Sequence, residues 1–338
     1  MGKLGKFFGS IITRGLGEFN RIYSIDATSG AKLRNPYKDS VWVMRAIKSV
    51  AQPIASVPVV FTEGGNTESL IEDQNLSDFW KNPFLNLSYY DGIEATVGWL
   101  KLKGEAFWIA DDSWLVPFPS VGQRSKLMIA RPDKMRAIVE NEEIIAWEYR
   151  SEKGKQHIFL PEQVWHHKFW NPYDSLRGLA EMSAAETAAE ADYLAGQFKR
   201  NLMRSNGDRG VYVIAKNGQP DENQRKQIIE QIRSKQYANQ KGEAKALFLS
   251  GDFSIEDPKI QAPDAAFHSG RLHDRHEVFI AFGVPASMAD VQASYSIGSA
   301  SDRFRLIEDT CMPTGAKIAE GIEYFGGRQS QRPNLQAA

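Results

Sequence analysis

The sequence has little cysteine, no dominant charge and no long apolar run. A single cysteine, Cys311, among 338 residues excludes an intrachain disulfide framework and a zinc site built from several cysteines, and is typical of a reducing compartment. The 41 Lys and Arg residues balance 42 Asp and Glu residues, for a formal net charge of -1. This balance excludes a protein that holds nucleic acid by bulk positive charge and an acidic disordered scaffold. No apolar run reaches the roughly 18 to 20 residues that span a bilayer, so no membrane partner is expected.

Sequence motifs for common enzyme chemistry are also absent. There is no Gly-x4-Gly-Lys-Ser/Thr phosphate loop, no complete Gly-x-Gly-x-x-Gly, no His-Glu-x-x-His and no Gly-x-Ser-x-Gly. The turn Asn171-Pro-Tyr173 is similar to the Asn/Asp-Pro-Pro-Tyr/Phe loop of amino-methyltransferases, but it lacks the second proline and no glycine-rich cofactor loop precedes it. A plain turn is the favoured interpretation, and a nucleic-acid-modifying methyltransferase stays as an alternative. No catalytic residue and no cofactor are predicted.

The histidines do not predict a metal site. His273 and His276 share a helix face, but His268 falls off that face, so helix-surface or interface histidines are the better interpretation. His166 and His167 are adjacent in a predicted strand, and adjacent strand residues point to opposite sides. We therefore expect one buried and one exposed ring, and no metal.

The first half of the chain predicts an α+β arrangement. Residues 1–40 read as a glycine-rich arm, and either Asp39 or Ser40 can cap a helix in which Trp42, Ala46 and Val50 recur at helical spacing. A second helix follows Ser88, which has capping-box spacing to Asp91. Short strands are then predicted at 105–110, 115–117, 127–130, 136–139, 144–149 and 157–160.

The composition changes abruptly at Gly178. Residues 179–204 contain no proline and many Ala and Glu residues, which predicts the strongest helix of the chain, with acidic residues near its start and basic residues at its end. This helix has few large apolar residues and is hard to bury within one chain. We therefore expect it to pack against copies of itself.

A compact α/β insert and further helices follow. The insert, residues 207–262, is expected to hold strands at 210–215 and 246–249 around a polar helix at 221–237. A second long helix begins after Pro263 and ends at Gly283-Val284-Pro285. Residues 286–299 are small, polar and irregular, residues 300–322 predict an amphipathic helix, and residues 323–338 predict a disordered tail.

Taken in order, short segments of this chain resemble the portal proteins of tailed double-stranded DNA phages of the siphophage type. No single segment is specific, but their ordered series from 41 to 313 is. The segments are Ile54-Ala-Ser-Val-Pro58, Trp80-Lys-Asn-Pro83, Gly104-Glu-Ala-Phe-Trp108, Ala130-Arg-Pro132, Pro161-Glu-Gln-Val-Trp-His166, Asn171-Pro-Tyr-Asp-Ser-Leu-Arg-Gly178, Asn206-Gly207, Leu247-Phe-Leu-Ser-Gly251, Pro263-Asp-Ala-Ala-Phe267, Ile280-Ala-Phe-Gly-Val-Pro285 and Met312-Pro313.

The resemblance implies a portal fold and a non-enzymatic function. Portal proteins form a ring, usually of twelve subunits, at one capsid vertex, and double-stranded DNA passes through it during packaging and ejection. The implied partners are other copies of the chain, the terminase large subunit that hydrolyses ATP, the major capsid protein and the head–tail connector. The implied location is the virion, after assembly in the host bacterial cytoplasm. A head–tail adaptor ring without a packaging role is a further alternative.

The resemblance also implies a division of the chain into portal subdomains. Residues 41–178 correspond to the wing, 179–206 and 263–285 to two stem helices, 207–262 to the clip, and 286–322 to the tunnel loop and the helix behind it. Portal proteins usually continue past the Met-Pro segment with a helical crown, so we expect the crown to be absent or truncated in this chain.

Each of these regions supplies candidate contact residues. The tunnel loop has no Lys or Arg, so it cannot grip phosphates by counterion release, and a channel that lets DNA slide needs such low-charge contacts. The residues expected at the DNA channel are Ser287, Met288, Val291, Gln292, Ser294, Tyr295 and Ile297. Those expected to meet terminase or the connector from the clip are Arg209, Lys216, Asp221, Arg225 and Lys226. Those expected between the stems of neighbouring subunits are Glu186, Glu190, Lys199, Arg200, Arg271 and Arg275.

Overall fold

The computed structural model describes residues 35–62, 74–110, 126–204, 212–215, 222–223, 226–231, 234, 253–256, 264–289 and 298–330. In the first half, helices come first and short antiparallel strands follow them, and helices dominate the second half, which confirms the predicted α+β class. The elements of the first half are α2 (Pro36–Asp39), α3 (Val41–Ala55), α4 (Gln74–Lys81), α5 (Tyr89–Lys103), β1 (Glu105–Ile109), β2 (Met128–Ala130), β3 (Met135–Glu140), β4 (Glu143–Arg150), β5 (Gln156–Phe159) and β6 (Val164–Lys168). Those of the second half are α7 (Glu181–Arg204), β7 (Tyr212–Ala215), β8 (Phe253–Glu256), α9 (Asp264–Ala281), α10 (Gly298–Arg305) and α11 (Met312–Ser330).

Of the two predicted caps for α3, Ser40 is the one that caps the helix, and α5 begins at its predicted cap, Ser88. The Ser40 Oγ atom accepts a hydrogen bond from the Val43 amide at 3.4 Å, and the Ser88 Oγ atom accepts one from the Asp91 amide at 3.0 Å. Helix α5 ends at Gly104, which adopts a left-handed conformation with φ 76° that favours glycine. The two helices pack against each other, and α5 also packs on β1.

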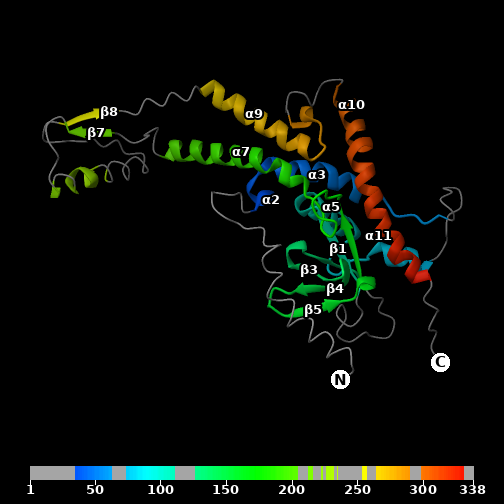
Figure 1. The fold of residues 1–338 in the computed structure, drawn as a ribbon. Coiled ribbons are helices and arrows are strands. Elements are labelled where there is room, and N and C mark those ends of the chain that lie inside the picture. The colour runs from blue at the N-terminus through cyan, green and yellow to red at the C-terminus, as the bar shows by residue number, and fades with distance from the viewer. Residues whose placement is uncertain are drawn as a thin grey trace. The chain divides into compact units, whose positions relative to one another are not determined.

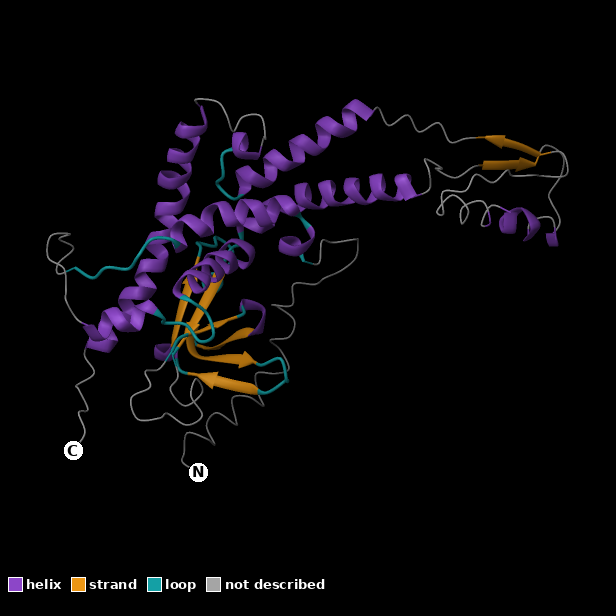
Figure 2. Ribbon diagram, turned by 180° about the vertical axis from the view of Figure 1, so that it is seen from behind, coloured by secondary structure: helices purple, strands orange, loops and turns teal. Residues whose placement is uncertain are grey.

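Two three-stranded antiparallel sheets form the β part of the first half (Figure 2). One has the order β2-β1-β6, and the other has the order β3-β4-β5. Strand β1 lies in the middle of the first sheet, where Phe107 is opposite both Ala130 of β2 and His166 of β6. All five residues of β1 are buried, because both faces of this sheet are covered.

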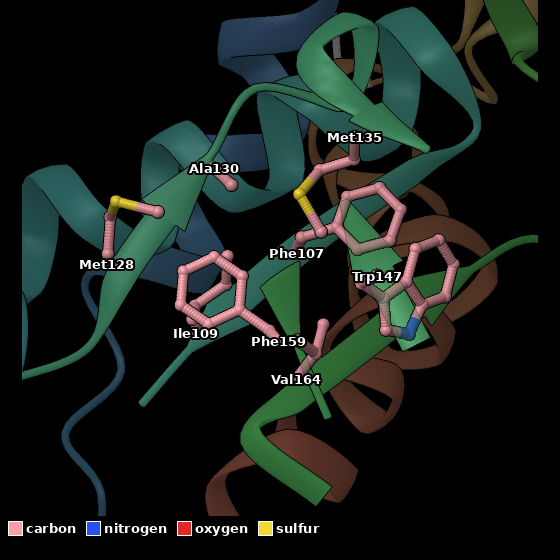
Figure 3. Packing of buried hydrophobic residues seen from close by; sticks show 8 residues of the cluster. All are labelled: Phe107, Ile109, Met128, Ala130, Met135, Trp147, Phe159 and Val164. Atoms are coloured by element: carbon pink, nitrogen blue, oxygen red, sulfur yellow. The ribbon is translucent and has the colours of Figure 1, made fainter. Parts of the chain in front are cut away.

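A hydrophobic cluster holds the two sheets together (Figure 3). It is centred on Phe107 of β1 and Trp147 of β4, whose ring centroids lie 4.9 Å apart in an edge-to-face arrangement. The opposite face of β1 meets helices, because the Trp108 indole donates a hydrogen bond to Thr96 of α5 at 2.8 Å. The full cluster consists of Phe107, Ile109, Met128, Ala130, Met135, Trp147, Phe159 and Val164.

Burial on both faces of the first sheet corrects the prediction for the two histidines. His166 and His167 do lie on opposite sides of β6, as expected, but neither ring is exposed. The His166 side chain is 11 % exposed and stacks on Phe107, and His167 is 3 % exposed and packs against Trp108. The sequence of β6 alone does not reveal that a second sheet covers one of its faces and helices cover the other.

Helices α7 and α9 lie side by side in the second half (Figure 1). The helix predicted at 179–204 is confirmed over Glu181–Arg204, and the predicted stop at Gly283 is confirmed, since α9 ends at Ala281 and Gly283 has φ 71°. The strand paired with β7 is β8, at Phe253–Glu256. The strand predicted at 246–249 falls outside the described residues.

The C-terminal helix is longer than the sequence predicts. Helix α10 runs into a π-helical segment, Leu306–Cys311, and then into α11, which continues to Ser330. This corrects the prediction of a disordered tail from residue 323 onward. The reason is tertiary packing: Phe325 is buried, and the Tyr324 ring lies 4.6 Å from that of Trp165 and donates a hydrogen bond to the Glu162 carbonyl at 2.9 Å. Residues 331–338 lie outside the described residues.

Candidate functional site

Two glycines bring the end of α5 against the start of α7. A Cβ atom on Gly178 would lie 2.0 Å from the Gly104 carbonyl oxygen, and a Cβ atom on Gly104 would lie 2.4 Å from the Leu179 carbonyl carbon. Any larger residue at either position would therefore push the two backbones apart. The abrupt change in amino-acid composition that the sequence shows at Gly178 therefore coincides with a close contact between two backbones.

A buried ion pair reinforces the same junction. The Lys101 ammonium group lies 2.8 Å from the Glu181 carboxylate, and the side chains of Lys101 and Glu181 are 1 % and 30 % exposed. Burial raises the pKa of Glu181, and the neighbouring Lys101 opposes that shift. The ammonium also lies 5.4 Å from the Phe169 ring centroid. Lys101 therefore ties α5 to the first turn of α7.

A second charged cluster joins β1 to the loop before α7. The Glu105 carboxylate, on a residue that is 3 % exposed, contacts the Arg177 guanidinium through Oε1 and the His166 ring at 2.9 Å through Oε2. Arg177 also donates to the Met135 carbonyl at 3.0 Å. Burial lowers the pKa of His166, with Glu105 opposing the shift. The loop 169–180 is thereby fixed to both sheets.

An ion pair connects helices α7 and α9. The Arg271 Nε atom lies 2.8 Å from the Asp192 carboxylate, which belongs to a side chain only 11 % exposed. Met182, Ala185 and Ala189 occupy the same buried side of α7 as Asp192. Small residues on this side allow close approach of the neighbouring helices. The described parts of α7 and α9 thus form an antiparallel pair within one chain, running in opposite directions between the first half and the insert (Figure 1).

The segment after α9 is anchored at its beginning. The Gly283 carbonyl accepts a hydrogen bond from the Thr310 hydroxyl at 2.6 Å. A Cβ atom on Gly283 would lie 2.6 Å from the Thr310 hydroxyl oxygen. The Val284 amide returns to the Phe279 carbonyl at 2.9 Å, which closes the helix end. Thr310 belongs to the π-helical segment between α10 and α11. This segment therefore holds the residue at which the chain leaves α9.

Arg275 and Ser287 fix the next residues of this segment. The Arg275 guanidinium lies 4.4 Å from the Trp42 ring centroid, and its Nη1 atom donates to the Ala289 carbonyl at 3.1 Å. The Ser287 hydroxyl contacts the Asp302 carboxylate of α10, and the Met288 amide bonds to the Pro285 carbonyl at 3.0 Å. Residues 285–289 are thereby held between α3, α9 and α10.

The described structure contains only some of the predicted contact residues. Ser287 and Met288 are placed as above, Glu186 and Glu190 are half-buried on α7, and Lys199 and Arg200 are exposed there. Arg271 and Arg275 both have partners within the chain, at Asp192 and Trp42. Lys226 is exposed and pairs with Glu222 at 2.9 Å. The predicted residues outside the described residues are Val291, Gln292, Ser294, Tyr295, Ile297, Arg209, Lys216, Asp221 and Arg225.

The turn at Asn171 and the histidines of α9 have structural roles. Asn171 Oδ1 accepts a hydrogen bond from the Tyr173 amide at 3.0 Å, which makes Asn171-Pro-Tyr173 a turn, as favoured over a methyltransferase loop. His273 pairs with Glu277 at 3.1 Å, and no three His, Cys, Asp or Glu side chains gather to hold a metal ion anywhere in the described chain. No helix in the described ranges is long and apolar enough to cross a membrane.

The ion pairs at the start of α7 were not predicted from the sequence. Lys101 and Glu181 are 80 residues apart, and Glu105 and Arg177 are 72 apart. No local pattern connects residues at such distances. The sequence feature that indicates this junction is the pair of glycines at 104 and 178. Gly104 lies between α5 and β1, and Gly178 lies in the loop just before α7.

Comparisons with known proteins agree with this arrangement of elements. No curated protein sequence matches the chain significantly. Among solved structures, the neck of an empty gene transfer agent (GTA) particle computed with C6 symmetry matches with a TM-score of 0.60 and 20 % identity, over 88 % of this chain and 84 % of that one. The neck of a native GTA particle computed with C12 symmetry matches with a TM-score of 0.56 and 20 % identity, over 89 % and 82 %.

A portal protein of known structure and a family profile complete the comparison. An HK97-family phage portal protein from Corynebacterium diphtheriae matches with a TM-score of 0.57 and 15 % identity, over 86 % of this chain and 89 % of that one. The profile described as phage portal protein matches residues 41–334, from the start of α3 to beyond α11. The family is one of structural proteins, not enzymes, in keeping with the missing active-site motifs. Nearly the whole described chain lies within that match, and the protein belongs to the phage portal protein family.

Proposed function

We propose that this chain forms a closed ring at one vertex of a phage-like capsid, and that double-stranded DNA passes through the ring during packaging and ejection. The observation that carries the proposal is the antiparallel pair α7 and α9, which has two different outward sides, within a chain of the portal family. Different contact surfaces on the two sides of a subunit are what a ring of more than two subunits needs.

The proposed ring has twelve subunits and belongs to the neck of a virion. The similarity to a GTA neck computed with C12 symmetry supports this number and location. In the proposed ring, residues 41–178 are the wing, α7 and α9 the stem, residues 207–262 the clip and residues 286–299 the tunnel loop. Ser287, Met288 and the residues after them face the DNA.

Native mass spectrometry and electron microscopy of the purified chain test the ring. The expected result is a monodisperse annular oligomer whose mass is close to twelve times 38.0 kDa. A monodisperse monomer at every protein and salt concentration would overturn the proposal.

The clip is the proposed docking site for the terminase large subunit and later for the head–tail connector, and the major capsid protein surrounds the ring. Lys226 is the described candidate, since it is exposed on a helical segment of the insert. A pull-down with terminase tests this: rings that lack residues 207–261 should lose terminase. Retention of terminase by those rings would exclude the clip as its docking site. Absence of terminase binding by the intact ring would instead favour an adaptor ring without a packaging role.

A further inference from the structure

The side of α7 that faces away from its own chain carries a stripe of uncharged, mostly small residues. Ala184, Thr187, Ala191 and Leu194 recur three and four residues apart, and all four are exposed, Leu194 at 45 %. This spacing places them along one helix face, opposite to the buried side that holds Met182, Ala185 and Ala189. Such a seam is typical of a helix that packs against another at a small angle.

Helix α9 carries a different outward stripe. Gly270, His273, Glu277 and Ile280 are exposed and again lie three and four residues apart, with Ile280 at 63 %. The opposite side of α9 holds Arg271, Arg275 and the buried Val278, which face the rest of the chain. The α7/α9 pair therefore has two unlike outward stripes.

Gly270 has no explanation within its own chain. A Cβ atom at this position would meet no atom of the described residues within 4 Å, and the residue lies inside a regular α-helix. Glycine in a helix interior is less favourable than alanine, so its presence there favours a partner that approaches the backbone closely.

From these features we propose that the α7 stripe of one subunit packs against the α9 stripe of the next subunit, with Ala191 and Leu194 opposite Gly270. This inference rests on the proposed ring and names its stem contact. The partner of this surface is a second copy of the chain. A cyclic ring has no rise between subunits, so segments at equal height along the ring axis meet.

The ion pair within the chain fixes which residues of α7 and α9 lie level with each other along the pair. Arg271 contacts Asp192, which places Gly270 at the level of Ala191 and Leu194. The sizes are then complementary, because the large Leu194 side chain faces the helix position with no side chain. At the end of the pair nearer the first half of the chain the sizes are exchanged: the large residue, Ile280, is on α9 and the small residue, Ala184, is on α7.

Hydrogen-bonding groups are complementary at the same level. Glu190 is half-buried and flanks the α7 stripe next to Ala191, whereas His273, one helical turn from Gly270, is 72 % exposed in the α9 stripe. A carboxylate that approaches His273 from the neighbouring subunit adds to the Glu277 carboxylate already 3.1 Å from its ring.

Cysteine cross-linking of assembled rings tests the contact. In rings of the Leu194→Cys, Gly270→Cys double variant, mild oxidation should give a ladder of covalent multimers on a denaturing gel. The control pairs Leu194→Cys with Ile280→Cys, because Ile280 lies about 15 Å from Gly270 along the same stripe, beyond the reach of a disulfide. The native Cys311 is buried and serves as a background in each variant.

The cross-linking outcomes separate this inference from the proposed ring. Rings that form by electron microscopy but give no ladder, or that cross-link as well through the control pair, overturn the stem contact and leave the ring. Failure of the unmodified chain to form rings overturns both.

A bulky substitution at Gly270 gives an independent measurement. Gly270→Leu should lower the fraction of chain in rings by about tenfold or more, since overpacking at a closely packed contact is destabilising and is repeated at every interface of the ring. The melting temperature of the dissociated subunit should not fall, because leucine favours the helix and the position is open. Unchanged ring formation by a folded Gly270→Leu chain overturns the contact.

Discussion

Lys101 of α5 and Glu181 of α7 form an ion pair at 2.8 Å in which the lysine side chain is 1 % exposed. A lysine this deeply buried depends on its carboxylate, because an unpaired charge in the interior is strongly unfavourable. The pair lies beside the contact of Gly104 with Gly178, so the start of α7 is held to the first half of the chain by charge and by backbone packing together.

Replacing Lys101 with methionine should destabilise the chain. We expect a loss of about 2 kcal/mol in the free energy of unfolding, less than the 3–5 kcal/mol typical of a fully buried pair, because Glu181 is 30 % exposed and still reaches water. Urea unfolding measures the loss. Lys81→Met is the matched control, since the Lys81–Asp78 pair is exposed and should contribute about 1 kcal/mol or less. Equal losses in the two variants would contradict a structural role for the buried pair.

Alanine at Gly104 should be much less well tolerated than alanine at Gly154. Both glycines have a positive φ, 76° and 77°, but a Cβ atom on Gly154 meets open space, whereas one on Gly104 meets the backbone of Leu179. Gly154→Ala should cost about 1–2 kcal/mol for the left-handed conformation alone. Gly104→Ala should cost a further 1–3 kcal/mol or so, because the backbone of residues 178–180 must move. Thermal unfolding of both variants checks this, and similar melting temperatures would argue against the close contact.

Acidification should weaken the fold through His167. Burial lowers the pKa of His167 to about 3, and its Nδ1 atom pairs with the Lys317 carbonyl at 3.0 Å. In the unfolded chain the pKa of histidine is about 6.5. Between these two values the unfolded state binds more protons, so stability present above about pH 6.5 falls as the pH is lowered towards 3. At pH 5 the expected loss is about 2 kcal/mol from this residue.

A His167→Phe variant isolates this contribution. Phenylalanine fills the site near Trp108 without titrating, so the difference in unfolding free energy between pH 7.5 and pH 5 should shrink by about 2 kcal/mol relative to the original chain. His157→Phe is the matched control, because it removes one half-buried histidine from β5 by the same substitution. If His167→Phe leaves the pH dependence unchanged, His167 is not the responsible group.

The hydroxyl of Thr310 should matter for the segment after α9. Thr310→Val removes the hydrogen bond to the Gly283 carbonyl, 2.6 Å long, and should cost about 1 kcal/mol. Thr310→Ser keeps the hydroxyl and should retain most of that bond. Hydrogen exchange followed by mass spectrometry should show faster exchange of peptides covering 282–289 in Thr310→Val but not in Thr310→Ser. Equal exchange in both variants would indicate that the loop is held by its other contacts, at Arg275 and Ser287.

Much of the local structure could be predicted because local chemistry decides it. Ser40 and Ser88 cap helices through bonds to amides three residues away, and Gly283 ends α9 because a left-handed residue there favours glycine. The strands around Phe107 and Trp147 follow from short apolar runs between turns. Family membership followed from the order of many weak segments, none of which was specific by itself.

The remainder was decided by contacts between residues far apart in the sequence. Burial of both His166 and His167 needs a second sheet on one face of β6 and helices on the other, and the continuation of α11 past Gly326 and Gly327 needs the packing of Tyr324 and Phe325. The class, the order of the elements and the ends of most helices can be read from the sequence, since they depend on residues within a few positions of one another. The contact of Lys101 with Glu181 and the outward sides of α7 and α9 emerge only in the folded chain, because they depend on packing between distant segments.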